Sequence, residues 1–272
     1  MKDLLRLLVC HDEDIPLDVA ALDIARIEFP DLEAEPWIGL LDSYASELAE
    51  RILEESTGLE YIGKANHFLF EELGFRGNED DYYSPFNSCL NQVLVERTGL
   101  PITLSLVYIE ISRRLGRPIC GIGMPGHFLV EYNDGETRRY IDPFHAGRVL
   151  GGEECLALAS KVTGMDLSDN WTALAPVSKR QMALRMLNNL RAAYLRRGTW
   201  AKALEVQDLL VDAAPGEALE YRQRGYLHLQ MRNFHDAARD LRKYLTLAPG
   251  ARDKEDVEKR LQSLRRWAAG MN

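Results

Sequence analysis

The chain has 272 residues, of which 46% are hydrophobic and 28% are charged, a balance typical of a globular protein and not of a disordered or fibrous one. Its formal net charge of −9 argues against a globally basic nucleic-acid-binding protein. This length suggests one large domain or two ordinary ones, with enough residues to bury a core without metal or disulfide bonds.

The sequence also predicts a cytoplasmic location. No stretch approaches the roughly 18–20 apolar residues that a membrane span needs, so no membrane partner is expected. The first residues do not have the pattern of a secretory signal, because Arg6 interrupts the leucines and the mainly acidic segment 11–14 follows at once. We therefore expect free thiols, and we expect no structural zinc because no CxxC pair occurs among Cys10, Cys89, Cys120 and Cys155.

Apolar residues recur at helical spacing through the first part of the chain. This spacing predicts helices over 17–29, 36–56, 60–73, 88–97 and 102–115. Residues 74–85 contain two glycines and a proline and predict a polar loop before the fourth helix.

After residue 116 the pattern changes to short β-rich segments. Strands are predicted at 119–122, 128–132 and 138–141, and Asn133-Asp134-Gly135 is typical of a hairpin turn. A helix over about 153–162 follows. Helices followed by a small antiparallel sheet predict an α+β domain over residues 1–170.

His127 and Asp142 follow the helix at 102–115 in an order that indicates a candidate catalytic centre. In papain-like folds a nucleophile stands at a helix N-terminus, where the helix dipole stabilises a thiolate. A histidine on the next strand activates it, and a carboxylate on the following strand orients the imidazole. A hairpin turning at 133–135 would bring His127 and Asp142 together. The alternative is structural: Asp142 satisfies a buried His127 and braces the two strands.

The tail has a different organisation, and we place its boundary near Pro176. Ser178 can cap a new helix, with Gln181 at the capping-box position. Residues 198–203 and 214–216 align with 232–237 and 248–250 at an offset of 34, a period that resembles tetratricopeptide repeats. We predict a repeat domain over 178–270, with repeats at about 184–217 and 218–251 and a capping helix at about 253–268.

Charge also divides the chain. Residues 1–177 carry 14 Lys and Arg against 31 Asp and Glu, whereas residues 178–272 carry 19 against 11. The basic tail could attract acidic peptide segments, or it could dock on its own acidic neighbour.

Several segments together resemble the transglutaminase-like domain of the bacterial SirB-type protein family. They are residues 66–75, 87–91, 99–106, 113–118, 125–128 and 141–144, and the tail with residues 187–190 is similar to that family too. The resemblance covers most of the chain. It implies an α+β, papain/transglutaminase-like N-terminal domain followed by an all-α tetratricopeptide-repeat domain.

One departure affects the expected function. Active transglutaminase-like proteins carry Gly-x-Cys at the start of the nucleophile helix, and the matching stretch here is Gly99-Leu100-Pro101. Proline suits the first turn of a helix but has no nucleophilic atom. The resemblance therefore implies a His127–Asp142 pair without its thiol.

Other residues could take part in the same cleft. Cys89, at the first turn of a predicted helix, could be a substitute nucleophile or a packed hydrophobe. Thr103 could serve as a nucleophile or could cap its helix. Asn87, Asn91 and Arg148 are candidate cleft contacts, and Arg148 could instead pair with the acidic surface.

A metal is not expected at this cleft. His127, Asp142 and His145 have the residue types of a two-histidine, one-carboxylate site. The SirB-type family tends to have asparagine where His145 stands, which argues against a required ligand. No cofactor is expected either.

Two functions remain open. The first is a non-catalytic adaptor of the cytoplasm whose cleft around His127, Asp142, Asn87 and Pro101 binds a protein or peptide, with the repeats as a second contact surface. The second is an acyl transferase or amide hydrolase that uses Cys89, or Thr103, with His127 as base. No nucleic-acid partner is expected, and the oligomeric state does not follow from the sequence.

Overall fold

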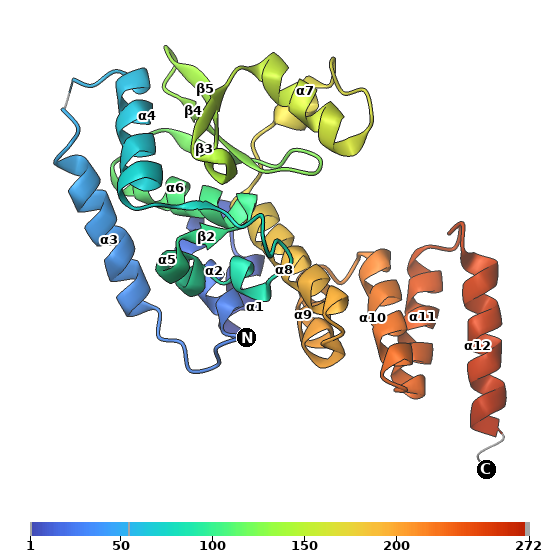
Figure 1. Cartoon of the computed structure of the whole chain (residues 1–272). Helices are drawn as coiled ribbons and strands as arrows, with labels where there is room; N and C mark the ends of the chain where they lie inside the picture. The colour runs from blue at the N-terminus through green and yellow to red at the C-terminus, as the bar shows by residue number, and fades with distance from the viewer. Residues whose placement is uncertain (1, 54, 270–272) are drawn as a thin grey trace. The chain divides into compact units, whose positions relative to one another are not determined.

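The structure is a computed structural model that describes residues 2–53 and 55–269 (Figure 1). It divides into two compact units. The N-terminal unit is Arg6–Met186, and the repeat unit comprises the described residues from Leu187 onward together with those before Arg6. Among the described residues, no helix has both the length and the apolar character needed to cross a bilayer.

Helices fill the first half of the N-terminal unit (Figure 1). In chain order they are α1 (Lys2–Val9), whose residues before Arg6 are grouped with the repeat unit, η1 (Asp12–Asp14), α2 (Leu17–Ala25), α3 (Glu35–Ala49), α4 (Gly58–Asn66), the π-helical η2 (His67–Glu72), η3 (Pro85–Ser88), α5 (Leu90–Glu96) and α6 (Pro101–Arg114). The predicted helices are confirmed in place, and α1 was not predicted.

The helix predicted over 17–29 ends at Ala25. Two further predicted helices differ from the structure for physical reasons. The helix predicted to reach residue 56 ends at Ala49, and Leu53 beyond it is 74% exposed, so no buried apolar face supports a continuation. The helix predicted over 60–73 begins at Gly58, because Thr57 and Glu60 form a capping box, and becomes π-helical from His67.

Helix α6 is the centre of this unit. Its residues from Pro101 to Ser112 are all buried, so it is not the one-sided amphipathic helix that its sequence stripe suggests. It contacts α2, α3 and α5 as well as the strands β3 and β4. A helix covered on all sides gives a rigid base for the loops at its N-terminus.

The predicted antiparallel sheet is confirmed and has one further strand. Its order is β3–β4–β5–β6, with β3 (Ile119–Ile122), β4 (Leu129–Asn133), β5 (Arg138–Asp142) and β6 (Arg148–Leu150). Val130 pairs with Ile141 across the predicted hairpin. A separate parallel pair joins β1 (Arg76–Gly77) to β2 (Thr98–Gly99).

The two faces of the sheet pack against different helices. Leu129 and Tyr140 belong to a core cluster with Cys155 and Leu156 of α7 (Gly152–Thr163), which is followed by η5 (Trp171–Leu174). Tyr132, whose side chain points to the other face, stacks on Tyr61 of α4 with ring centroids 5.6 Å apart. The sheet is thus covered on both faces, and its end near Asp142 carries the site described below.

The tail consists of antiparallel helix pairs, as its period predicts. The helices are α8 (Lys179–Arg196), α9 (Trp200–Ala213), α10 (Ala218–Gln230), α11 (Phe234–Leu247) and α12 (Lys254–Ala269). The predicted capping box is confirmed at the start of α8, where Ser178 and Gln181 exchange hydrogen bonds of 2.9 and 3.1 Å. The carboxylate of Asp12 adds bonds from the backbone N–H groups of Lys179 and Arg180.

Small residues allow the repeat helices to approach closely. Ala203 in α9 and Ala237 in α11 are fully buried. A Cβ atom added to Gly225 of α10 would lie 2.9 Å from Cγ of Leu241 in α11. Small residues therefore occupy these close contacts between the repeat helices.

Candidate functional site

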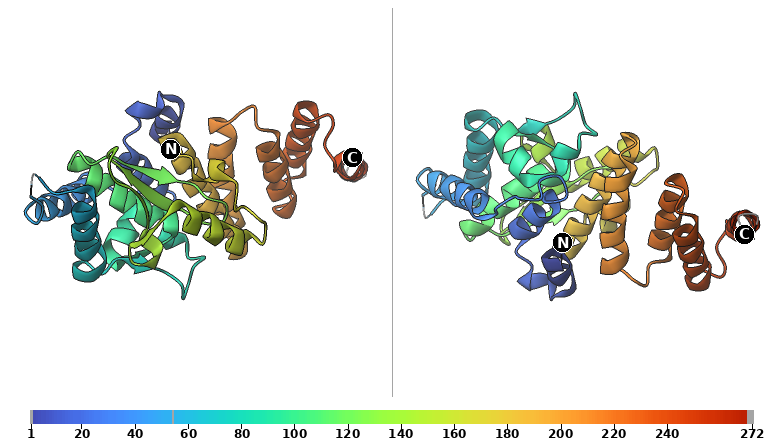
Figure 2. Two further views of the ribbon diagram at one scale, coloured as in Figure 1. Left: turned by 90° about the horizontal axis from the view of Figure 1, so that it is seen from above. Right: turned by 90° about the horizontal axis from the view of Figure 1, so that it is seen from below.

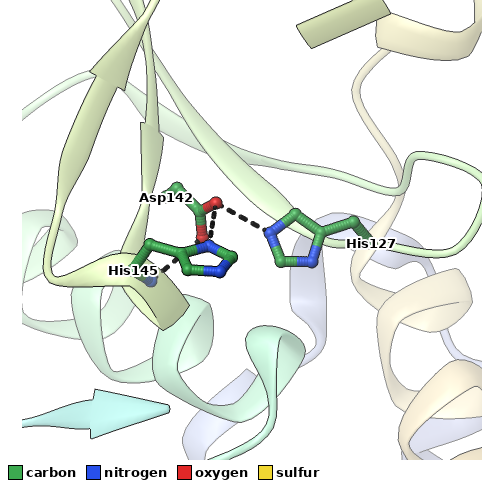
Figure 3. A group of neighbouring side chains, drawn as sticks. All are labelled: His127, Asp142 and His145. Atoms are coloured by element: carbon green, nitrogen blue, oxygen red, sulfur yellow. Dashed lines mark hydrogen bonds and ion pairs between the residues drawn. The ribbon is translucent and has the colours of Figure 1, made fainter. Parts of the chain in front are cut away.

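The structure brings His127 and Asp142 together. The Nε2 atom of His127 lies 2.9 Å from Oδ2 of Asp142, and both side chains are buried, at 8% and 1% exposure (Figure 3). The hairpin produces this pairing, because His127 lies just before β4 and Asp142 is the last residue of β5. Within the described residues, Nδ1 of His127 makes no hydrogen bond.

A second imidazole binds the same carboxylate oxygen. Nδ1 of His145 lies 2.7 Å from Oδ2 of Asp142, and the His145 side chain is 47% exposed (Figure 3). His145 is the last residue of the short helix η4 (Pro143–His145). Asp142 caps η4, since its Oδ1 accepts hydrogen bonds from the backbone N–H groups of Phe144 and His145. Asp142 thus orients both rings and the backbone between them.

The chain turns sharply directly after η4. Ala146 and Gly147 both have positive φ, at 53° and 74°. The Nδ2 atom of Asn66 donates to the Gly147 carbonyl at 2.6 Å, and a Cβ atom on Gly147 would lie 2.4 Å from the Phe70 ring. Only glycine fits this close approach. The turn therefore fixes the position of His145.

These contacts determine the charge and the tautomers at the site. Burial alone would raise the pKa of Asp142, but the hydrogen bonds and charge of His127, and then those of His145, lower it below its ordinary value. The carboxylate is therefore ionised and can only accept hydrogen bonds. When the two rings are neutral, His127 carries its proton on Nε2 and His145 on Nδ1, which leaves Nδ1 of His127 as a free base.

Aromatic rings that the sequence does not predict at the site lie next to His127. Phe144 lies edge-on to His127 with centroids 6.2 Å apart, and Tyr82 lies edge-on to Phe144 at 5.9 Å. Tyr82 and its neighbour Tyr83 are exposed. A Tyr-Tyr pair inside an otherwise polar loop was the available sequence signal, but only the fold places it beside the histidine.

Arg185 of α8 supports the His127 loop from the other side. Its Nη2 donates to the carbonyl oxygens of Met124 and His127 at 3.0 and 2.8 Å, and its guanidinium lies over the Phe128 ring. Removal from water lowers the pKa of Arg185. Nothing in the local sequence of α8 indicated this contact.

The start of α6 is closed by internal hydrogen bonds. Pro101 is its first residue and is buried. The Oγ1 atom of Thr103 accepts the Leu100 N–H at 2.9 Å and donates to the Asn87 carbonyl at 2.8 Å. Of the two roles considered for Thr103, the hydroxyl therefore has the contacts of a helix cap.

The three candidate cleft residues lie in different surroundings. The Asn87 amide is buried and bonds to Asn78 and to the carbonyls of residues 81 and 82. Asn91 is buried in α5, and its Oδ1 has no hydrogen-bond partner among the described residues. Arg148 is exposed, 3.9 Å from Glu154. Arg148 is the cross-strand partner of Asp142 in the β5–β6 pair. In the part of the chain that is described, the side-chain hydrogen bonds and ion pairs of these three residues do not reach His127 or the Asp142 carboxylate.

The thiols have unfavourable surroundings for nucleophilic chemistry. Cys89 is fully buried at the N-cap of α5, with Sγ 3.5 Å from the Pro85 carbonyl oxygen. Burial raises the pKa of Cys120 to about 12, with the charge of Glu131 adding to the effect, and burial likewise raises the pKa of Cys155 to about 12. Both are therefore protonated at neutral pH.

The chain is similar to known protein families. Residues 35–188 match the Transglutaminase-like superfamily, and residues 190–262 match the tetratricopeptide repeat. This chain belongs to the transglutaminase-like superfamily. A UPF0162 protein of Xylella fastidiosa is 37% identical over 257 residues, covering 93% of this chain and 91% of the relative.

Other relatives of this transglutaminase-like protein include bacterial and animal proteins. Protein SirB1 of Salmonella typhimurium is 23% identical over 233 residues, covering 85% of each chain, which supports the SirB-type resemblance. F-box only protein 21 of Homo sapiens is 30% identical over 191 residues, covering 65% of this chain and 30% of that protein.

The repeat unit of this transglutaminase-like protein contains a cavity of about 290 Å³. Apolar and aromatic side chains share its lining with amide groups and one arginine, namely Arg191, Leu195, Trp200, Gln207, Gln223, Tyr226, Leu227 and Gln230. Arg191 bonds to Glu220 and Gln207, so its charge is neutralised within the unit. Tetratricopeptide repeats indicate contacts with other proteins in general.

Proposed function

We propose that this protein is a non-catalytic binding or adaptor protein with two binding surfaces. The site around His127 and Asp142 binds a peptide or a side chain without forming a covalent bond to it, and the repeat unit supplies a second contact for protein. The observation that carries this proposal is that Pro101 stands at the start of α6, where an active relative presents its cysteine, while the His127–Asp142 hydrogen bond is present.

The contacts of the remaining nucleophiles support the absence of catalysis. Thr103 uses its hydroxyl to cap α6, and Cys89 is fully buried, with its sulfur against the Pro85 carbonyl. A nucleophile needs a base within hydrogen-bond reach and access to substrate. In this structure the Thr103 hydroxyl and the Cys89 sulfur are both buried and contact backbone groups of the protein.

The retained pair still has the properties of a binding site. Nδ1 of His127 can accept a hydrogen bond from a ligand N–H, or donate one after protonation. The rings of Phe144 and Tyr82 provide flat apolar surfaces next to it. A peptide segment that carries a polar hydrogen and an apolar side chain matches this combination.

The repeat cavity suits an extended peptide. The amides of Gln223 and Gln230 can bond to a peptide backbone, while Leu195 and Tyr226 can pack against a side chain. The chain then acts as an adaptor by holding one protein segment at each surface.

A labelling experiment tests the non-catalytic half of the proposal. The full chain carrying Cys10→Ala, which removes a partly exposed thiol, is treated at neutral pH with a thiol-reactive acyl probe. It is compared with the same chain carrying in addition Cys89→Ala, Cys155→Ala or His127→Ala. We expect slow labelling that does not depend on His127. Rapid labelling confined to Cys89 and lost in His127→Ala would favour the acyl transferase or amide hydrolase instead.

A binding experiment tests the repeat surface. The full chain is applied to a library of immobilised peptides, and the bound peptides are measured again with a Gln223→Ala, Gln230→Ala double variant. We expect at least about a tenfold loss of affinity, because two hydrogen-bonding side chains are removed. The matched control is Gln262→Ala, on the exposed face of α12. Equal binding by all three proteins would contradict the assignment of this surface.

A further inference from the structure

The strongest unassigned feature is the pair of imidazoles on one carboxylate oxygen. One ligand atom from each of His127, Asp142 and His145 lies within 4.8 Å of the others. Figure 3 shows the two rings turned toward the Asp142 carboxylate, one from the loop before β4 and the other from η4. The ring centroids are 5.6 Å apart and inclined by 47°, so they are not stacked on each other.

We infer that His127, Asp142 and His145 bind one divalent transition-metal ion such as Zn²⁺. Two imidazoles and one carboxylate are a ligand set that such ions accept, and three protein ligands leave a coordination position open for water or a ligand. The sequence by itself predicts no metal here, because the SirB-type family tends to have asparagine where His145 stands. In this chain the His145 ring reaches the same oxygen as His127.

The distances are close to those that a metal requires. Ligand atoms at about 2.0–2.2 Å from a tetrahedral zinc ion are about 3.3 Å from one another. The nitrogens of His127 and His145 are now 2.9 and 2.7 Å from Oδ2 of Asp142. Binding therefore asks each nitrogen–oxygen separation to open by about half an ångström, and it asks the two ring nitrogens, which lie within 4.8 Å of one another, to be about 3.3 Å apart. The exposed side chain of His145 can make most of this movement by rotation, while its backbone stays held by the turn.

The protons can be accommodated without breaking the site. Each neutral ring now directs its N–H at Asp142, and a metal would take that nitrogen. The ring proton then moves to the other nitrogen, Nδ1 of His127 or Nε2 of His145, so neutral rings release no net proton. A protonated ring cannot bind a metal, so binding must weaken in acid.

The surroundings of the three residues hold them in place. Oδ1 of Asp142 accepts two backbone N–H groups, and Arg185 binds the His127 carbonyl. Groups of this kind orient metal ligands in proteins. The half-exposed His145 side chain leaves a path by which an ion can enter.

The test uses the full chain with Cys10→Ala after treatment with a chelator. Calorimetric titration with ZnCl₂ measures stoichiometry and affinity, and the visible absorption of added Co²⁺ reports nitrogen and oxygen ligation. We expect one equivalent bound. His145→Asn keeps the His127–Asp142 pair but removes one ligand, and we expect it to weaken binding by at least about tenfold.

His67→Asn is the matched control. His67 is an exposed histidine whose ring lies beside Glu71 and Glu72, so it tests whether any histidine near acidic groups binds the ion. We expect its affinity to stay within about twofold of the parent, because a distant site should be independent. The inference is overturned if the parent binds no Zn²⁺, or if His145→Asn binds it as tightly as the parent. Co²⁺ bands typical of thiolate ligation would assign the binding to a cysteine and also overturn it.

These outcomes are separate from the proposed function. Peptide binding by the repeat surface and the absence of acyl labelling do not require a metal. A negative titration would therefore leave the adaptor proposal in place, and failure of peptide binding would leave the metal site testable by itself.

Discussion

At the scale of single residues, Asp142 has the largest influence on the site. Its side chain accepts bonds from two imidazoles and from two backbone N–H groups, although it is only 1% exposed. A buried carboxylate is costly unless it is paired. Here the partners come from β4's leading loop and from η4, so the ionised form links the hairpin to the turn after it.

Asp142 predicts a pH dependence of stability. The pKa of Asp142 is lowered in the folded protein, although burial opposes this. Its contribution to the free energy of unfolding is therefore complete above the unfolded-state pKa of about 3.9 and is lost as pH falls through the folded-state pKa. We expect Asp142→Asn to lower the free energy of unfolding by about 1–3 kcal/mol at pH 7. The difference from wild type should shrink as pH falls below about 3.9.

Urea denaturation at several pH values measures this difference. Asp169→Asn, at an exposed carboxylate of the same unit, is the control and should follow the wild-type curve. A difference between Asp142→Asn and wild type that stays constant down to pH 3 would refute the role given to the ionised carboxylate.

At the scale of elements, the turns within the two helix pairs of the repeat unit have the same backbone conformation but a different residue at the position with positive φ. Gly198 lies between α8 and α9 with φ 68°, and Arg232 lies 34 residues later with φ 60°. The turns also share a backbone bond, from Thr199 to Tyr194 and from Asn233 to His228. The period therefore extends to the backbone conformation.

Arg232→Gly should stabilise the protein. A non-glycine residue in the left-handed region is strained, and Arg232 is exposed, so the loss of its side chain removes little packing. We expect a gain of about 0.5–1 kcal/mol in the free energy of unfolding. Thermal denaturation measures it, and the reciprocal change Gly198→Ala should lower stability by a similar amount. A lower melting temperature for Arg232→Gly would show that the turn gains nothing from glycine.

At the scale of the whole molecule, two compact units with opposite charge are joined by one continuous helix. α8 begins in the N-terminal unit and continues into the repeat unit. Figure 2 shows the ribbon of each unit from two further sides. Because each unit has its own core, a defect in one core should first destabilise that unit.

Ala203→Trp tests this division. Ala203 is fully buried between repeat helices, and an indole there overpacks the helix pair. We expect the repeat unit to unfold, while hydrogen exchange in β3–β5 stays protected. Lys202→Trp, at the neighbouring half-exposed position, is the control and should leave both units folded. An unchanged melting profile for Ala203→Trp would count against the repeat packing.

Local patterns in the sequence were sufficient for most elements, because periodicity, caps and turns act between near neighbours. The 34-residue period located α9 and α11, Ser178 and Gln181 located the start of α8, and the turn after Asn133 placed His127 opposite Asp142. The sequence alone likewise shows that position 101 is a proline and has no thiol.

Only the tertiary structure decided how the remaining side chains are used. Thr103 caps α6 through the Asn87 carbonyl, Arg185 holds the His127 loop from 58 residues away, and His145 shares an oxygen with His127. These contacts join segments that are far apart or depend on a left-handed turn, and burial, not local propensity, determines them. Residue types alone therefore suggested candidates, while the packing of α6, the sheet and α8 determined which of them meet.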